Sequence, residues 1–393
     1  MTTYRKTATK TAAVTGAAGV LVALLSACAP EPAALSWGAC SGSDLDPRQE
    51  CATLQVPLDH DEPEGEQIAR AVSRIRAADP DPDARRGTLL LVPGGPGEPG
   101  LSDPSTAAAA LPQEVLDAYD LVSFDPRGVA QSTQVNCDLA PEDLSPVKLR
   151  GWPTPDGDIT EVAATAERFA DACLAHGGPL LEEISTANEA RDMDRIREAL
   201  GEKEISLWGV SYGTYAGAVY AQLFPDRTDR VVLDSSDDPD PTRVGRQWLA
   251  NYAVGVEDAF PAFAAWAADP ANPQRLAEDP EQVRPLFLDL AARLDREPLP
   301  WPGANPPELS GNVLRQSLLD ALYAPDRYSR LAALMRAARD GTALPEPRTA
   351  PAAALQNSAA AIVGTICNDV AWPTDLATYT RDVAASRESH PLT

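Results

Sequence analysis

The chain of 393 residues carries 58 acidic and 33 basic side chains, which gives a formal net charge of −25 and an isoelectric point near 4.4. This charge balance argues against nucleic acid as a partner, because affinity for a phosphate backbone comes mainly from Lys and Arg. With 44% hydrophobic residues the chain can bury one large core or two modest ones, so the composition indicates a globular protein and excludes disordered and fibrous classes.

The first segment, 1–27, has the layout of an export signal. Basic residues at its start precede an apolar stretch from Ala12 to Leu25, which is shorter than the roughly 20 residues of a membrane span. The Leu-Ser-Ala-Cys sequence that ends at Cys28 resembles a bacterial lipobox. We therefore predict an exported protein, lipidated at Cys28 and anchored to the membrane there; a plain signal peptide and a secreted product are the alternative.

Export makes the remaining cysteines informative, because thiols pair in an oxidising compartment. The economical pairing joins Cys40 to Cys51 and Cys137 to Cys173, closing loops worth about 3 and about 4 kcal/mol in the chain-entropy model. Cys367 is left over. We predict that it is a free thiol, the alternative being a partner that lies outside this sequence.

Apolar patterns next predict the strands of an α/β protein. Two alternating stretches, 52–58 and 67–77, predict an antiparallel pair. Four shorter runs are apolar on both faces and end in Gly- or Asp-rich turns: 88–92, 121–125, 205–210 and 230–234. Helical patterns occur at 192–200 and 214–223. Parallel strands with crossover helices indicate a doubly wound, mostly parallel sheet.

From about 239 to 354 the strand runs stop and the chain becomes Ala-rich and helical in period. A helical insertion after a parallel strand indicates a lid over the carboxyl edge of the sheet, where α/β proteins bind ligands. Three tryptophans in it are expected to belong to the core of the lid: Trp248, Trp266 and Trp301. The predicted domains are a signal at 1–27, a core at 28–238, a lid at 239–355 and an incomplete return to the core at 356–393. The sequence has no P-loop, dinucleotide fingerprint or metal-spaced His/Cys set, so no cofactor or metal is predicted.

A Gly-x-Ser-x-Gly motif spans Gly209 to Gly213, directly after a predicted strand and at the start of a predicted helix. This is the setting of a nucleophile elbow, a sharp turn that exposes the Ser211 hydroxyl in a strained backbone conformation. Gly209 and Gly213 leave room where a Cβ would clash. The backbone N–H of Tyr212, at the positive end of the helix, would point toward a developing oxyanion. A structural glycine-rich turn is the alternative.

A second oxyanion donor is predicted in the loop 93–97, which follows the strand run 88–92. Its sequence, Pro-Gly-Gly-Pro-Gly, combines flexible glycines with bracing prolines and has no side chain that would block a carbonyl oxygen. The amide of Gly94 or Gly95 can therefore be aimed at the oxyanion. An ordinary Gly/Pro turn is the alternative.

Five segments together resemble the secreted bacterial tripeptidyl aminopeptidases, relatives of proline iminopeptidase within the α/β-hydrolase superfamily. They are GGPG at 94–97, FDPRG at 124–128, DMDR at 192–195 ahead of ALG at 199–201, WGVSYGTYAG at 208–217 and VVLD at 231–234. The resemblance runs from about Cys40 to the chain end. It implies Ser211 as nucleophile, Tyr212 and the loop 94–95 as oxyanion hole, and a turn at 125–128 beside it.

The chain also departs from that family. It has Ala130 and Ser235 where the family has glycine. In the family, Cys367 and Asp369 match an Ile-Cys-x-Asp segment that precedes the last strands. No apolar strand run follows this segment here, so the last strands of the sheet, with the triad Asp and His that they carry, are expected to be missing from this sequence.

The three histidines fit that expectation. His60 and His176 precede Ser211, whereas the triad order of this fold places the His after the Ser. Only His390 has the required order, and it lies in a polar tail that we expect to be frayed. We therefore expect negligible turnover from the chain as given, and self-association through an uncovered edge strand at 230–234.

The sequence predicts an exported serine peptidase that releases short peptides from free N-termini by acyl-enzyme chemistry. A carboxylester hydrolase of the same fold and a non-catalytic, peptide-binding lipoprotein are the alternatives. A carboxylate near the lid hinge should pair with the α-ammonium of the substrate. The residues considered for this role are Asp237, Asp238, Asp240, Glu257 and Asp258.

Overall fold

The computed structural model describes residues 35–393 except 43, 80–83, 237, 241–243 and 349, so Cys28 and Asp237 lie outside the described residues. Its central element is a sheet of seven strands in the order β1-β2-β3-β5-β4-β6-β7. These are β1 (Gly38–Ala39), β2 (Glu50–Pro57), β3 (Gln67–Ile75), β4 (Gly87–Val92), β5 (Tyr119–Phe124), β6 (Ile205–Val210) and β7 (Thr228–Asp234). All six predicted strands are present.

The sheet is antiparallel at its start and parallel where the site lies. β2 pairs with β1 and β3, and β3 with β5, in antiparallel register. β4 pairs in parallel with β5 and with β6, and β6 with β7. Parallel strands put their carboxyl ends at one edge, so the turns after β4, β5 and β6 converge. The mostly parallel sheet predicted from the sequence is confirmed.

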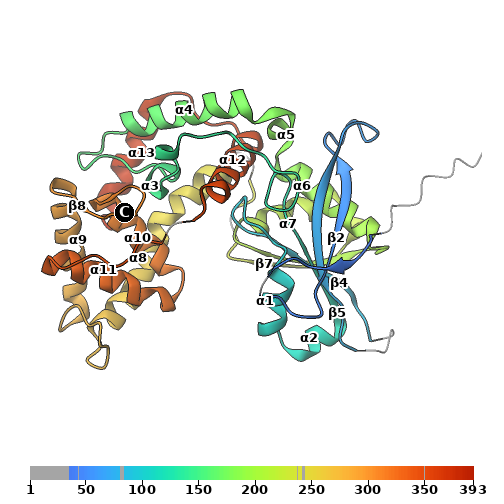
Figure 1. Ribbon diagram of the computed structural model, residues 1–393, viewed down its shortest axis with the longest axis horizontal. Coiled ribbons are helices and arrows are strands. Elements are labelled where there is room, and N and C mark those ends of the chain that lie inside the picture. The colour runs from blue at the N-terminus through green and yellow to red at the C-terminus, as the bar shows by residue number, and fades with distance from the viewer. Residues whose placement is uncertain (1–34, 43, 80–83, 237, 241–243, 349) are drawn as a thin grey trace, which may run out of the picture. The chain divides into compact units, whose positions relative to one another are not determined.

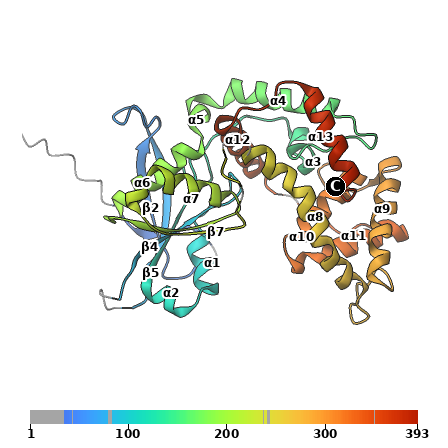
Figure 2. The same ribbon diagram turned by 180° about the vertical axis from the view of Figure 1, so that it is seen from behind.

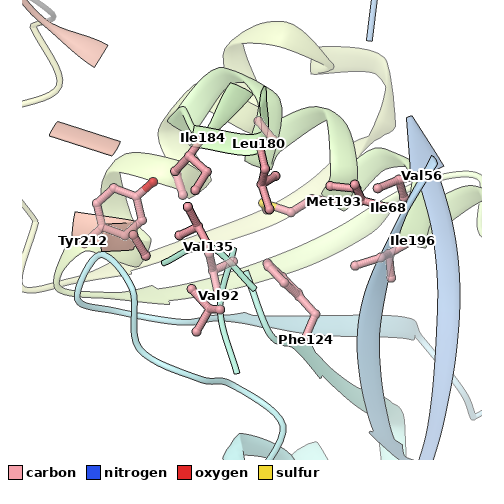
Figure 3. Close-up of a cluster of buried hydrophobic side chains, with 14 of the residues drawn as sticks. Val56, Ile68, Val92, Phe124, Val135, Leu180, Ile184, Met193, Ile196 and Tyr212 are labelled. Carbon is pink, nitrogen blue, oxygen red and sulfur yellow. The ribbon is translucent and has the colours of Figure 1, made fainter. Parts of the chain in front are cut away.

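Helices cover both faces of the sheet (Figures 1 and 2). α6 (Thr186–Ala199) and α7 (Tyr212–Leu223) pack together on one face, and α1 (Asp103–Ala110) and α2 (Gln113–Ala118) lie against β5 on the other. The larger apolar core lies under α6 and α7, where Met193, Ile196 and Tyr212 meet Val92 and Phe124 (Figure 3). Burial of these side chains stabilises the sheet by about 2 kcal/mol each.

Strand β7 leaves its apolar residues uncovered. It pairs only with β6, and its Val231, Val232 and Leu233 are exposed to 37%, 53% and 38%. Within the part of the chain that the structure describes, no further strand continues the sheet beyond β7. The edge position predicted for this strand is confirmed.

The segment after β7 is helical, as predicted, apart from a two-stranded ribbon. It contains α8 (Val244–Ala268), α9 (Pro280–Arg296), β8 (Leu299–Pro300), β9 (Glu308–Leu309), α10 (Gly311–Leu322) and α11 (Tyr328–Asp340). Phe260, Phe263, Phe287 and Tyr328 form its aromatic centre, with contacts between ring centroids of 5.4 to 6.2 Å. It therefore has an apolar core of its own.

Two of the three tryptophans belong to that core. Trp266 packs on Phe263 and Tyr328, and Trp301 is buried, so the expectation for these two is confirmed. Trp248 instead contacts Tyr252, 6.1 Å away between ring centroids.

The remaining helices lie before α6 and after α11. They are α3 (Pro146–Leu149), α4 (Thr160–His176), α5 (Gly178–Glu183), α12 (Ala352–Asp369) and α13 (Leu376–Ser389). The expectation of a frayed C-terminal tail is wrong, because Asp375 caps α13 through the backbone N–H of Thr378 and the side chain of Leu392 is fully buried. Among the described residues, no helix is long and apolar enough to cross a membrane.

The cysteines pair as the sequence predicted. Disulfides join Cys40 to Cys51, at the start of β2, and Cys137 to Cys173, on α4. Cys367 is free and exposed near the end of α12. The second disulfide closes the longer loop and ties α4 to the turn that follows β5.

Candidate active site

Ser211 lies between β6 and α7 in a conformation that L-amino acids rarely adopt. Its φ and ψ are 56° and −127°, and its backbone N–H donates to the carbonyl of Asp234 on β7. Such a conformation costs about 1–3 kcal/mol and persists only where the surrounding structure enforces it. The strained turn predicted for the motif is therefore present at Ser211.

Both motif glycines are required by packing. A Cβ on Gly209 would lie 2.1 Å from the carbonyl oxygen of Gly213, and one on Gly213 would lie 2.3 Å from the carbonyl oxygen of Val92. Any larger residue would force the turn apart. The elbow is therefore locked between its own helix and β4.

The loop 93–97 passes beside Ser211. A Cβ on Gly94 would lie 3.3 Å from the carbonyl oxygen of Val210 and 3.7 Å from Ser211 Cβ, so the loop backbone approaches the serine closely. Gly95 has φ of 109°, which favours glycine. The structure thus brings Gly94, Gly95, Ser211 and Tyr212 together, as the sequence predicted.

Asp125 holds the chain just after this loop. One of its carboxylate oxygens accepts hydrogen bonds from the backbone N–H groups of Gly100 and Leu101, at 3.0 and 3.2 Å. The other accepts from the N–H of Gln131 at 2.8 Å. Burial raises the pKa of Asp125, and these three backbone hydrogen bonds oppose the rise. The turn that begins at Asp125 therefore braces the loop, as the resemblance implied.

The side chain of Tyr212 is anchored away from the cavity. Its hydroxyl and that of Thr186 are 2.6 Å apart, and the Thr186 hydroxyl donates to Asp369 at 2.6 Å, so the tyrosine is the donor to Thr186. The N–H of Thr186 also donates to Asp369, at 2.8 Å. Burial raises the pKa of Tyr212 well above its usual value. This chain of contacts fixes the first residue of α7, whose N–H follows the nucleophile.

A buried charged cluster lies under α6. Asp192 is bound by the guanidinium groups of Arg127, at 2.7 and 2.9 Å, and Arg70, and by His60 at 2.9 Å. Burial alone would raise the pKa of Asp192, but the two arginines hold it well below its usual range. Burial raises the pKa of nearby Glu189 to about 7, against the opposing effect of Arg70. His60 is therefore part of this cluster.

A cavity of about 600 Å³ opens over Ser211. Three carboxylates line it, from Glu98, Asp103 and Asp320, together with Arg150 and Arg327. Arg150 also stacks on Tyr252, 4.8 Å from the ring centroid. Burial raises the pKa of Asp103 to about 6. The cavity is thus a polar site with both signs of charge.

No histidine among the described residues lines this cavity. His176 ends α4, and His390 follows the last residue of α13, where its backbone N–H donates to Ser386. The described residues also contain no group of three or more His, Cys, Asp or Glu side chains arranged to hold a metal ion.

The carboxylates expected to receive an α-ammonium lie elsewhere. Asp238, Asp240, Glu257 and Asp258 do not line the cavity, and Glu257 pairs with Arg284 at 2.6 Å. The error arose because proximity to the lid hinge in sequence was taken as proximity to Ser211. The carboxylates that do line the cavity come from the loop after β4, from α1 and from α10.

The two departures from the family's glycines fall at unusual backbone positions. Ala130 has φ of 46° and Ser235 has φ of 65°, both in the left-handed region that favours glycine. A positive φ explains why glycine is expected there. The strain is borne here by an alanine and a serine.

Comparison with known proteins gives concordant matches. A family model described as alpha/beta hydrolase fold matches residues 87–310. A tripeptidyl aminopeptidase of Streptomyces coelicolor is 33% identical over 366 residues, covering 92% of this chain and 67% of that protein. Serine protease Hip1 of Mycobacterium tuberculosis is 32% identical over 291 residues, covering 72% of this chain and 54% of its own. A crystal structure of proline iminopeptidase from Mycobacterium smegmatis matches with a TM-score of 0.35 and 14% identity, over 73% of this chain and 68% of that chain.

Proposed function

Because the chain belongs to the α/β-hydrolase fold family, as a serine peptidase, we propose that it releases short peptides from free N-termini by acyl-enzyme chemistry at Ser211. The Ser211 oxygen bonds to the scissile carbonyl carbon, the C–N bond breaks, and the serine proton leaves with the amine. Water then hydrolyses the ester. The N–H groups of Tyr212 and of Gly94 or Gly95 hold the oxyanion.

The observation that carries this proposal is the backbone conformation of Ser211. Its positive φ is enforced by two glycines that packing requires, and the turn faces a cavity large enough for a short peptide. A structural glycine-rich turn would not need a strained serine at the mouth of a cavity. The name of the Streptomyces relative supports release of three residues from an N-terminus.

Proton transfer is the step that the described cavity does not supply. Because no histidine among the described residues lines it, we propose that Ser211 lacks its general base there and reacts slowly. Losing the histidine of a comparable triad costs on the order of 10⁶-fold in kcat. Peptide binding in the cavity should be unaffected, because binding does not need the base.

The test separates binding, acylation and turnover. Tripeptide anilides and short acyl esters are offered to the purified chain and to Ser211→Ala, with and without added imidazole as an external base. We expect little turnover without imidazole, and a Ser211-dependent acyl adduct in the intact mass spectrum that grows when imidazole is present. An adduct of equal size in Ser211→Ala, or no saturable peptide binding by either protein, contradicts the proposal.

The same assay addresses the alternatives. Acylation by short esters but never by peptide anilides would favour the carboxylester hydrolase. Retained peptide binding with no adduct at any imidazole concentration would favour the non-catalytic binding protein. Turnover that disappears in both Ser211→Ala and His390→Ala would make His390 the base, and would overturn the proposal that the base is absent from the cavity.

We also propose that the protein is exported and lipidated at Cys28. The layout of residues 1–27 and the Leu-Ser-Ala-Cys sequence support this. Expression in a bacterial host followed by detergent partitioning should place the native chain in the detergent phase and a Cys28→Ser variant in the aqueous phase. Aqueous partitioning of both would contradict lipidation.

A further inference from the structure

Glu98 places a carboxylate directly beside the nucleophile. It follows the loop 93–97, and a Cβ built on Gly94 would lie 3.9 Å from a carboxylate oxygen of Glu98 and 3.7 Å from Ser211 Cβ. The carboxylate and the serine therefore flank the same glycine. Glu98 is also an exposed side chain of the cavity wall.

The backbone of Glu98 is held on both sides. Pro96 and Pro99 restrict it, and the N–H of Gly100 donates to Asp125 at 3.0 Å. A Cβ on Gly100 would lie only 2.4 Å from the carbonyl oxygen of Phe124, so the loop is pressed against the end of β5. A side chain projecting from so constrained a loop has a defined place in the cavity.

Glu98 differs from the other carboxylates of the cavity in its surroundings. Among the described residues, no hydrogen bond or ion pair reaches its side chain, and the ionisable neighbour that it influences is another carboxylate, Asp103. Asp320, in contrast, feels Arg150 and Arg327 and accepts a hydrogen bond from Gln316 at 2.9 Å. The negative charge near Ser211 is therefore uncompensated, whereas the charge on α10 is balanced.

The distance from Ser211 limits which part of a peptide can reach Glu98. The residue whose carbonyl is attacked is adjacent to Ser211. The α-ammonium of a three-residue acyl group lies two residues further on, about 7 Å away at 3.3–3.6 Å per residue. Glu98 therefore faces the residue that immediately precedes the scissile bond.

We propose that Glu98 makes the cavity select peptides with a positive charge on the residue that precedes the scissile bond. This rests on the proposed function and adds to it a specificity residue. The cation is either a Lys or Arg side chain at that residue or, in a peptide cleaved after its first residue, the α-ammonium itself. An acidic side chain at the same place would meet an unpaired carboxylate and be rejected.

The experiment measures binding, so it does not depend on turnover. Calorimetric titration of the Ser211→Ala chain uses four peptides that differ in one charge each: Lys-Ala-amide and norleucine-Ala-amide, each with a free or an acetylated N-terminus. Preference for Lys over norleucine in the acetylated pair assigns the side chain as the cation. Preference for the free over the acetylated norleucine peptide assigns the α-ammonium, and with it release of a single residue.

The expected effect is a roughly fivefold tighter binding of the cationic member of a pair, which 0.5 M salt reduces. Adding Glu98→Gln should bring the ratio to one, and Glu98→Asp should retain part of it. Asp320→Asn, which removes the balanced carboxylate, is the matched control and should leave the ratio unchanged. Unfolding curves of all variants confirm that they fold equally.

The outcomes separate this inference from the proposed function. Equal binding of all four peptides, or a cation preference that survives Glu98→Gln, overturns the role of Glu98 and leaves the peptidase proposal standing. Loss of the preference in Asp320→Asn but not in Glu98→Gln moves the role to Asp320 and also overturns it. Failure of every peptide to bind counts against the proposed function as well.

Discussion

The sheet and the helical segment α8 to α11 bury different kinds of side chain. Under α6 the sheet region encloses Arg70, Arg127, Asp192 and Glu189, all under 5% exposed. The helical segment fills its core with aromatic and aliphatic groups, and its ion pairs, such as Arg315 with Asp295, retain contact with solvent. Buried charge is thus concentrated in the region that presents Ser211.

This difference teaches where the molecule is vulnerable. An apolar core loses stability gradually as atoms are removed, whereas a buried ion cluster leaves an uncompensated charge when one member is lost. The sheet region also leaves apolar residues uncovered on β7, whereas the helical segment covers its own. The sheet region should therefore respond more strongly to single changes in charge, to pH and to its surroundings.

The largest expected effect is loss of Asp192. Asp192→Ala leaves Arg70 and Arg127 buried without their shared carboxylate, so the free energy of unfolding should fall by about 3–5 kcal/mol. Asp295→Ala, which breaks the partly exposed pair with Arg315, should cost about 1 kcal/mol. Urea unfolding followed by circular dichroism measures both. Equal costs would remove the contrast between the two regions.

The second effect concerns covalent support, which only the sheet side of the molecule has, because 244–340 contains no cysteine. Replacing Cys137 and Cys173 together by alanine should lower stability by up to about 4 kcal/mol, since the disulfide closes a separation of 36 residues. A reductant should lower the melting temperature of the native chain but not of a variant lacking both disulfides. An unchanged melt of the native chain under reduction would show that the bonds are absent in solution.

The third effect is a pH dependence from Glu189. The folded state raises its pKa from 4.5 to about 7, so the folded protein holds a proton that the unfolded chain releases. Stability from this group is complete below about pH 4.5 and is lost as pH rises to about 7, by roughly 3 kcal/mol. Glu189→Gln should remove that part of the slope, while Asp103, whose pKa is also raised, keeps a smaller one. Identical pH profiles of the two proteins would contradict the assignment.

A smaller effect is expected at the two strained residues. Ala130→Gly and Ser235→Gly relieve a positive φ and should each raise the melting temperature, by an amount equivalent to about 1 kcal/mol or less, because glycine also loses more entropy on folding. Ala337→Gly, within α11, is the matched control and should destabilise by about 1 kcal/mol. Destabilisation by all three variants would mean that the strain is not released.

The smallest effect on stability, but a visible one on association, is expected at β7. Val232→Lys adds a charge to the uncovered strand and should change the free energy of unfolding by less than about 0.5 kcal/mol. Sedimentation velocity at micromolar concentration should show self-association of the native chain and less of it in the variant. A monodisperse native monomer would show that the exposed edge is not adhesive.

Local patterns account for what could be predicted. The strands of the parallel sheet are short apolar runs, and the elbow requires a strand, two glycines and a helix within about a dozen residues. Contacts between distant residues could not be predicted in this way. Thr186 and Asp369 are separated by 183 residues, and nothing near either one indicates that both support Tyr212. The polar α13 lacks an apolar stripe, so its helix was missed.

The elbow glycines also constrain how this motif can change during evolution. Since a Cβ on Gly209 or Gly213 would collide with backbone 2.1 and 2.3 Å away, either substitution damages the fold before it affects chemistry. A lineage that abandoned catalysis would therefore keep both glycines, because selection for folding alone preserves them. Activity would be lost first through freely replaceable groups such as a histidine on a loop. The Gly-x-Ser-x-Gly pentapeptide is then a durable record of ancestry, and only the surroundings of Ser211 report whether the enzyme still turns over.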